Sequence, residues 1–283
     1  MDSPLRFVGG KAHLLKYILP FPFHNTYLEL FGGSAIVLLN KPSSDSETYN
    51  DINGRLVNFW NTLRDSFELL RVRCEHQLWS RANFEKCLEH SESEIEDAFR
   101  FFYINSHSHS GNNKDYKGIH FTRPSNYIAV YHNSLKRFDE VYKRIRFVNF
   151  ECQDFAVLLN RFLARENNEM VVYADPPYFN GGEVYEKTTG GVNWSASRAR
   201  ELGEILRQFE KAKIVVSIDD ENYLPWKNKK KVARVNRVPM QLTNRDYEMY
   251  EYVFKNFDER EKANNVCNKR VAFRSAFRPR RFV

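Results

Sequence analysis

The tetrapeptide Asp175-Pro176-Pro177-Tyr178 combines residue types that can hold a planar amine. It ends the apolar run Met170 to Asp175 (MVVYAD), which is typical of a buried parallel strand, and α/β sheets bind ligands at the carboxyl ends of such strands. The prolines fix φ and lack N–H donors, which leaves the Asp175 carboxylate and the Pro176 carbonyl as a rigid pair of acceptors. The aromatic Tyr178 can stack on a planar base. A plain proline turn is the alternative interpretation.

Two further segments could bind a nucleoside. Leu30 to Ala35 (LFGGSA) lies where a strand pattern becomes a helix pattern, and glycines there let a ligand approach the backbone and the N–H groups of the helix start. The segment is not GxGxxG, which disfavours a dinucleotide. Asp51, within Tyr49 to Asn53 (YNDIN), ends the next strand and could accept hydrogen bonds from ribose hydroxyls. The alternatives are a tight turn for the first segment and a helix cap for Asp51.

The elements that must position these residues alternate between short apolar runs and helical patterns, which predicts an α/β fold. Strands are expected at Thr26–Phe31, Thr48–Ile52, Met170–Asp175, Ile214–Ile218 and Glu251–Phe257. Helices are expected at Ser34–Asn40, through Leu56, Phe59, Trp60 and Leu63, and at Glu94–Asn105, Asn133–Arg144 and Arg198–Phe209.

A change of texture along the chain predicts its domain organisation. The stretch 66–146 is rich in charge, His, Asn and aromatic residues, and we expect it to form an inserted, mainly helical lobe. A polar loop, Ser106 to Asp115, is expected within it. Residues 1–65 and 147–258 are then the catalytic core, and 259–283 form a basic C-terminal tail.

Composition narrows the classes of partner. The chain has 283 residues, a net charge of +7 and a pI of about 9.1, which is typical of either an anionic partner such as nucleic acid or a solvated basic surface. Aromatic residues interleaved with Lys and Arg suit unpaired bases and favour nucleic acid. Its apolar runs are too short to cross a bilayer, and no apolar signal region follows Met1, so no membrane partner is expected. Four scattered cysteines without a CxxC pair favour reduced thiols and a cytoplasmic location. His107 and His109 lack a third ligand, so no metal is expected.

The ordered set FVGGK (residues 7–11), LELFGGSA (28–35), YNDIN and DPPYF resembles the Dam-type (alpha-group, D12 class) family of site-specific DNA adenine methyltransferases over most of the chain. The resemblance implies a Rossmann-like S-adenosylmethionine-dependent methyltransferase sheet with an inserted target-recognition lobe. It implies a catalytic role for Asp175, Pro176, Pro177 and Tyr178, with Tyr178 stacking on a flipped base. It implies cofactor contacts from Phe7, Gly9, Gly10, Lys11, Glu29, Phe31, Gly32, Gly33, Ser34, Asp51, Ile52, Asp154, Phe155 and Asp175.

The resemblance also implies that the lobe reads double-stranded DNA. Arg100 to Gly111 (RFFYINSHSHSG) is similar to the family's recognition helix and loop, but it departs from GATC-reading relatives at Asn105-Ser106 and Ser110-Gly111. The resemblance therefore does not carry GATC specificity over to this chain. For the loop residues, an ordinary solvated loop is the alternative. The candidate DNA contacts are Asn105, His107, Lys114, Arg123, Tyr127, Asn244 and Arg245.

The expected reaction is methyl transfer from S-adenosylmethionine to the exocyclic amine of a flipped-out adenine in duplex DNA, without a metal. A candidate partner is a restriction endonuclease of the same system, and a monomer or weak dimer is expected. Two alternatives stay open: an RNA adenine methyltransferase (or a methylase of another amine), and a non-catalytic DNA-binding protein on the same fold. Intact Lys11, Asp51, Asp175 and Tyr178 argue against the second.

Overall fold

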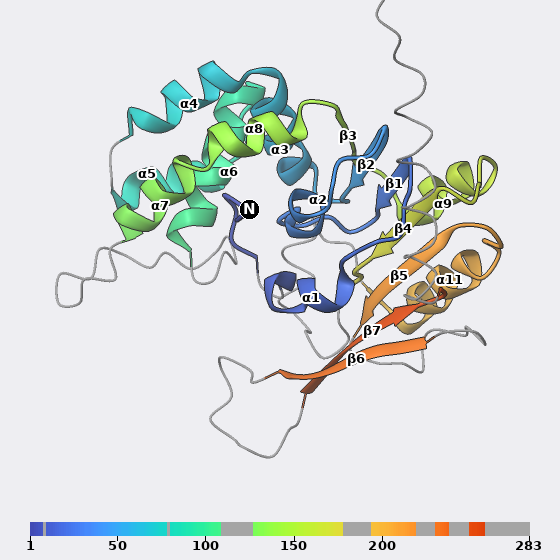
Figure 1. The fold of residues 1–283 in the computed structure, drawn as a ribbon. Helices are drawn as coiled ribbons and strands as arrows, with labels where there is room; N and C mark the ends of the chain where they lie inside the picture. The colour runs from blue at the N-terminus through green and yellow to red at the C-terminus, as the bar shows by residue number, and fades with distance from the viewer. Residues whose placement is uncertain are drawn as a thin grey trace, which may run out of the picture.

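The central element is a sheet with helices on both faces (Figure 1). This computed structural model describes residues 1–7, 10–77, 80–108, 127–177, 194–218, 230–237 and 249–257. The described strands form one seven-stranded sheet of order β3-β2-β1-β4-β5-β7-β6, in which β7 runs antiparallel to both of its neighbours and the other paired strands are parallel. The strands are β1 (Thr26–Glu29), β2 (Ser46–Asn50), β3 (Val148–Glu151), β4 (Met170–Ala174), β5 (Lys213–Ile218), β6 (Lys230–Arg237) and β7 (Met249–Lys255).

The helices lie between and beside these strands in the order expected of an α/β fold. They are η1 (Lys11–Leu14, a 3-10 helix), α1 (Leu15–Ile18), α2 (Ile36–Asn40), α3 (Gly54–Asp65), α4 (Phe67–Glu75), α5 (Arg81–Leu88), α6 (Glu94–His107), α7 (Tyr127–Leu135), α8 (Phe138–Ile145), α9 (Phe155–Leu163) and α11 (Ala196–Leu206). The predicted mixed α/β class is confirmed.

Two predicted boundaries in the helical stretch are wrong. Residues 133–144 were expected to form one helix, but a turn at Lys136 and Arg137 separates α7 from α8. The spacing of the buried Leu135, Phe138 and Val141 runs through the turn without a change of phase, so the break leaves no mark in the pattern. The polar loop expected from residue 106 begins later, because α6 continues to His107.

Both faces of the sheet are buried, as the alternation along β4 demonstrates. Val171 and Tyr173 pack into one hydrophobic cluster with the helices η1 to α8, whereas Met170, Val172 and Ala174 pack into a second cluster with α9 and α11. A strand buried on both sides carries a continuous apolar run, which is why MVVYA was recognisable in the sequence.

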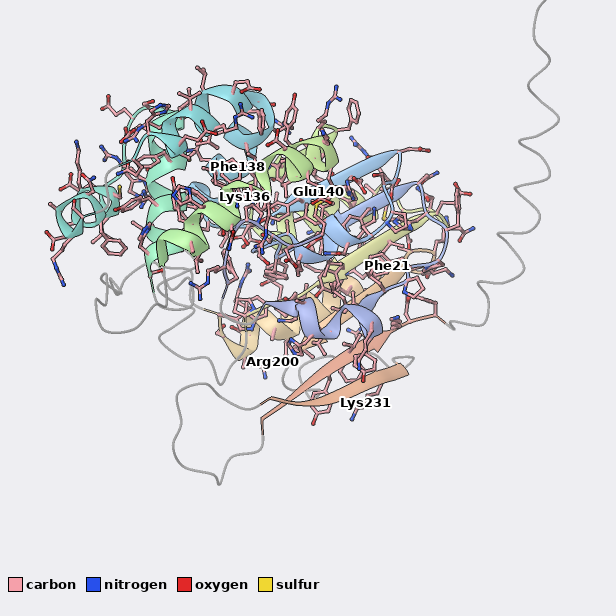
Figure 2. All side chains as sticks on the ribbon, turned by 60° about the vertical axis from the view of Figure 1, so that its left-hand side comes forward. Phe21, Lys136, Phe138, Glu140, Arg200 and Lys231 are labelled. Atoms are coloured by element: carbon pink, nitrogen blue, oxygen red, sulfur yellow. The ribbon has the colours of Figure 1, made fainter. Side chains whose placement is uncertain are left out.

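The helices α4 to α8 gather to one side of the sheet but share its first hydrophobic cluster (Figure 1). Phe59 of α3 stacks on Phe102 of α6 with ring centroids 5.8 Å apart, and both rings contact Phe138 of α8. Phe138, labelled in Figure 2, is fully buried. The division into a catalytic core and a recognition lobe stays a prediction, and these contacts tie the two proposed parts into one continuous apolar interior.

The strand order places a switch point between β1 and β4, from which the chain winds outward to β2 and β3 on one side and to β5 on the other. In doubly wound sheets, ligands bind at the carboxyl ends of the strands beside this point. None of the helices in the described ranges combines the length and the apolar content of a membrane span. Cys74, Cys87 and Cys152 are free thiols, and Cys267 lies outside the described residues.

Candidate active site at the carboxyl edge of the sheet

Asp175 directly follows β4 and forms an ion pair with the N-terminal segment. Lys11 Nζ lies 2.9 Å from Asp175 Oδ1, with the two side chains only 4% and 17% exposed. Lys11 begins η1, and the preceding Gly10 donates its N–H to the Phe7 carbonyl at 3.2 Å. The start of η1 therefore places the Lys11 ammonium group next to Asp175 at the switch point. Pro176 is buried and Pro177 half-buried, whereas Gly9 and Tyr178 lie outside the described residues.

The loop after β1 needs its two glycines for different reasons. A Cβ on Gly32 would lie 1.9 Å from the ring of Tyr49, so a side chain has no room there. Gly33 has φ +49°, a conformation that side chains disfavour, and the Phe7 ring lies 3.4 Å from where its Cβ would be. Tyr49 also donates its hydroxyl to the Gly33 carbonyl at 2.7 Å. The loop is thus held close against β2 and the N-terminal segment.

Asp51, just beyond β2, is fixed by backbone donors. Its two carboxylate oxygens accept the N–H of Gly33 and the N–H of Asn53, each at 2.9 Å. Burial raises the pKa of the Asp51 carboxyl, and these backbone hydrogen bonds oppose the rise. The cap of α3 is Asn53, whose side chain accepts from the Leu56 N–H at 3.3 Å. Asp51 is therefore not the side chain that caps α3, and it instead ties the glycine loop to the turn that precedes the helix.

Glu29, the last residue of β1, is a buried acid at the same edge. It accepts the Tyr27 hydroxyl at 2.7 Å and is 2% exposed. Burial raises the pKa of Glu29 to about 8; the Tyr27 hydrogen bond opposes the rise and the nearby Asp175 carboxylate adds to it. The Glu29 carboxyl therefore keeps its proton to a higher pH than an ordinary glutamate does.

An aromatic cluster of Phe31, Phe155 and Trp194 completes this edge. The ring centroids lie 5.6 Å apart for Phe31 and Phe155, 5.5 Å for Phe31 and Trp194, and 5.8 Å for Phe155 and Trp194. Asp154 caps α9 by accepting the Ala156 N–H at 2.9 Å and forms an ion pair with Arg198, whose guanidinium lies 4.3 Å from the Phe155 ring centre. Aromatic faces next to polar anchors are the surroundings that a nucleobase requires.

Comparison with known proteins assigns the chain to a family. The family model described as D12 class N6 adenine-specific DNA methyltransferase matches residues 7–238, a span that includes the N-terminal lysine, the glycine loop, Asp51 and Asp175. The chain belongs to the D12 class N6 adenine-specific DNA methyltransferase family.

Two individual proteins similar to this D12-class chain share less than a third of its residues by identity. The Type II methyltransferase M.FokI of Planomicrobium okeanokoites is 27% identical over 228 residues, which are 73% of this chain and 33% of that protein. The chain therefore spans about a third of the length of M.FokI. A crystal structure described as a methyltransferase, SMU.472, complexed with SAH shares 13% identity and a TM-score of 0.23 over 55% of this chain and 44% of that one, a similarity too low to support a comparison of sites.

Two predicted DNA contacts of this D12-class chain lie in its interior. Asn105 is 0% exposed, and its amide accepts from the Arg6 N–H at 2.9 Å and donates to the Arg6 carbonyl at 2.8 Å. His107 is 5% exposed, stacks on Tyr103 at 4.2 Å, and has a pKa lowered to about 4 because it is buried. Neither side chain can reach DNA in this structure. The resemblance to the family's recognition helix implied DNA contacts for both residues, but the last turn of α6 packs against the N-terminal segment and α7.

The other predicted site residues of the D12-class chain are placed as follows. Lys114, Arg123, Asn244 and Arg245 lie outside the described residues, and Tyr127 is the first residue of α7. Ser34 is buried next to Gly33, and Ile52 is half-buried next to Asp51. Among the described residues, no group of three or more His, Cys, Asp or Glu side chains is placed to hold a metal ion.

Sequence reasoning missed two residues of this edge. Asn50 donates to the Leu30 and Gln153 carbonyls and accepts from the Gln153 N–H, each at 3.0 Å, and so ties together the ends of β1, β2 and β3. The sequence feature that could have indicated this role is a polar amide side chain at the last residue of a buried strand. Trp194, in the stretch GGVNWSAS, had no signal beyond a lone aromatic among small and polar residues.

Proposed function

We propose that this chain is a site-specific methyltransferase that transfers a methyl group from S-adenosylmethionine to the exocyclic N6 amine of adenine in duplex DNA. The observation that carries the proposal is the meeting of three elements at one switch point: Asp175 after β4, the glycine loop after β1 and Asp51 after β2. The strand order supports classing the sheet as a Rossmann-like methyltransferase sheet.

The residues at this edge fit S-adenosylmethionine. Asp51 is oriented by two backbone N–H groups and keeps further lone pairs for ribose hydroxyls, because a carboxylate offers about four acceptor sites. The backbone of Gly33 carries no side chain that would stand between the loop and a ligand. The partly buried Phe31 offers an aromatic surface to an adenine ring, with the buried Phe155 packed against it and Asp154 next to Phe155. When bound, the cofactor supplies an electrophilic sulfonium methyl group.

The chain's own residues activate and orient the amine. An adenine amine is a weak nucleophile because its lone pair is delocalised into the ring. The Asp175 carboxylate and the Pro176 carbonyl accept hydrogen bonds from its two N–H groups. These contacts polarise the nitrogen and orient its lone pair toward the methyl carbon. The acceleration of methyl transfer therefore comes mainly from orientation and electrostatics. Lys11 fixes one oxygen of Asp175 and leaves acceptor capacity on the carboxylate for the amine. The proton leaves to solvent after transfer.

Access to the amine requires that the base leave the duplex stack, at about a few kcal/mol of unstacking. We assign the stacking surface to Tyr178 and the reading of the target to the helical lobe, residues 66–146. Lys114, Arg123, Tyr127, Asn244 and Arg245 remain the proposed DNA contacts, supported by the net charge of +7. A cytoplasmic location and a restriction endonuclease of the same system belong to this proposal.

The first test replaces the proposed acceptor. We expect Asp175→Ala to lower the rate of methyl transfer to duplex DNA by at least about a hundredfold, because one of two preorganised acceptors is lost. The measurement is incorporation of labelled methyl, with binding of S-adenosylhomocysteine and circular dichroism as checks of the site and the fold. Glu204→Gln, which removes an exposed acid from α11, is the matched control and should leave the rate unchanged. Full activity in Asp175→Ala would refute the mechanism.

A further inference from the structure

Trp194 carries a buried donor without a partner. Its indole Nε1 is inaccessible to solvent and has no hydrogen-bond acceptor in the structure. By contrast Trp60, the other tryptophan in the described ranges, donates its Nε1–H to the Gly33 carbonyl at 3.4 Å. Most buried indole N–H groups find an acceptor, because an unmade hydrogen bond in the interior costs free energy. The exception at Trp194 requires an explanation.

The position of Trp194 connects this donor to the proposed cofactor site. Its ring meets Phe31 edge to face, at an interplanar angle of 83°, and lies 5.8 Å from Phe155. Phe31 precedes the glycine loop, and Phe155 follows Asp154, which Arg198 of α11 holds by an ion pair. Trp194 stands two residues before α11 and so adds a third wall to the aromatic cluster. Two of its three members already belong to the proposed cofactor site.

We infer that Trp194 is a binding residue for the adenine of S-adenosylmethionine, which it contacts with its ring edge and to whose ring nitrogen it donates the Nε1–H. The inference rests on the proposed function and extends it to a residue outside the motifs. An adenine presents ring nitrogens as acceptors on its periphery, and it is planar and largely apolar, so it matches both the donor and the surrounding aromatic rings. Binding of the nucleobase satisfies the donor, and the free energy of the unmade hydrogen bond is recovered as affinity.

A purely structural role for Trp194 makes a different prediction. If the ring only fills the hydrophobic cluster, replacement by phenylalanine removes an unsatisfied donor, keeps most of the ring contacts and leaves cofactor affinity unchanged. If the N–H binds adenine, the same substitution has opposite effects on two quantities. The thermal midpoint of the free protein stays the same or rises, because a buried orphan donor is gone, while affinity for the cofactor falls.

The experiment measures binding of S-adenosylhomocysteine by calorimetry, without DNA, to the wild type, Trp194→Phe and Phe162→Leu. Phe162 of α9 packs against the same hydrophobic cluster and controls for its general loosening. We expect Trp194→Phe to weaken binding about tenfold with an undiminished thermal midpoint, and Phe162→Leu to leave affinity within about twofold. Equal affinity of wild type and Trp194→Phe overturns the inference and leaves the proposed function standing. A wild type that fails to bind S-adenosylhomocysteine overturns both.

Analogues of the ligand identify the acceptor. S-adenosylhomocysteine variants in which N1, N3 or N7 of adenine is replaced by CH are titrated into the wild type and Trp194→Phe. We expect one analogue to bind the wild type about tenfold more weakly and to bind Trp194→Phe as well as the parent does, because donor and acceptor are then both absent. If the wild type and the variant discriminate equally among all three analogues, the proposed hydrogen bond does not exist.

Discussion

At the scale of single residues, the site is built from acids held in unlike environments. Asp51 is oriented by backbone donors, Asp175 is paired with Lys11, and Glu29 is fully buried and accepts the Tyr27 hydroxyl. These differences follow from what surrounds each carboxyl group and not from the residue type. For Glu29, the raised pKa predicts a dependence of stability on pH that can be measured directly.

We expect Glu29 to make the fold more stable at acid than at alkaline pH. Its folded-state pKa of about 8 lies above the value of an unfolded glutamate, so the folded protein binds the proton more tightly. This contribution is fully present below the unfolded pKa, falls as pH rises and is lost above pH 8. The variant Glu29→Gln mimics the protonated acid and should gain stability relative to the wild type between pH 5 and pH 9, by up to about 4 kcal/mol.

Urea unfolding of both proteins at pH 5 and pH 9 measures this difference. Glu204→Gln, at an exposed position on α11, should show no such dependence. An equal stability difference between Glu29→Gln and the wild type at both pH values would show that Glu29 is ionised throughout.

At the scale of elements, a buried charge cluster fastens the last helix of the lobe to the sheet. Arg144 of α8 donates to Glu47 of β2 at 2.6 and 2.9 Å and to the Leu38 carbonyl of α2 at 2.8 Å. Lys41, at the end of α2, forms an ion pair with the same carboxylate. Burial raises the pKa of Glu47, but Arg144 and Lys41 outweigh it, so the pKa of this carboxyl lies below its ordinary value. The cluster therefore joins three elements at one acid.

We expect Arg144→Met to destabilise the protein by about 3 kcal/mol, because it leaves a buried carboxylate with one partner fewer and a carbonyl without its donor. Arg71→Met is the matched control: Arg71 is 35% exposed, and its contacts with Glu68, Glu75 and Asp139 lie at 3.4 to 3.7 Å, so its loss should cost less than about 1 kcal/mol. Chemical unfolding of the two variants decides the point. Similar losses in both would mean that burial gives the Arg144 cluster no special weight.

The strands also show which parts of the fold could be predicted from the sequence. The strands β1, β2, β4, β5 and β7 were predicted near their observed positions, and among them β4 and β5 have the continuous apolar runs of strands buried on both faces. β3 was missed because VNFE is short and half polar, and β6 because KKVARVNR looks like a basic surface run. Asp175 and Asp51 could be predicted as site residues because each comes at the end of a predicted strand. The roles of Asn50 and Trp194 depend on contacts between distant segments, which no local pattern contains.

At the scale of the whole molecule, one hydrophobic cluster runs from the sheet into the helices α4 to α8. The predicted lobe is thus not joined by a loose linker, and its helices sit in a set position relative to the edge that holds Asp175. A shared hydrophobic core of this kind suits the proposed function, in which the lobe reads a sequence and the core presents one base to an acceptor pair. It also makes the interior position of Asn105 intelligible, since its amide holds the chain just before Phe7 and Lys11.

The most direct test of the account is transfer of labelled methyl from S-adenosylmethionine by the intact chain, with mixed-sequence duplex DNA and RNA in parallel and the modified positions mapped by sequencing. We predict N6-methyladenine in duplex DNA at one short motif and none in RNA. Incorporation only into RNA, or no incorporation into DNA while the cofactor binds normally, would contradict the central claim.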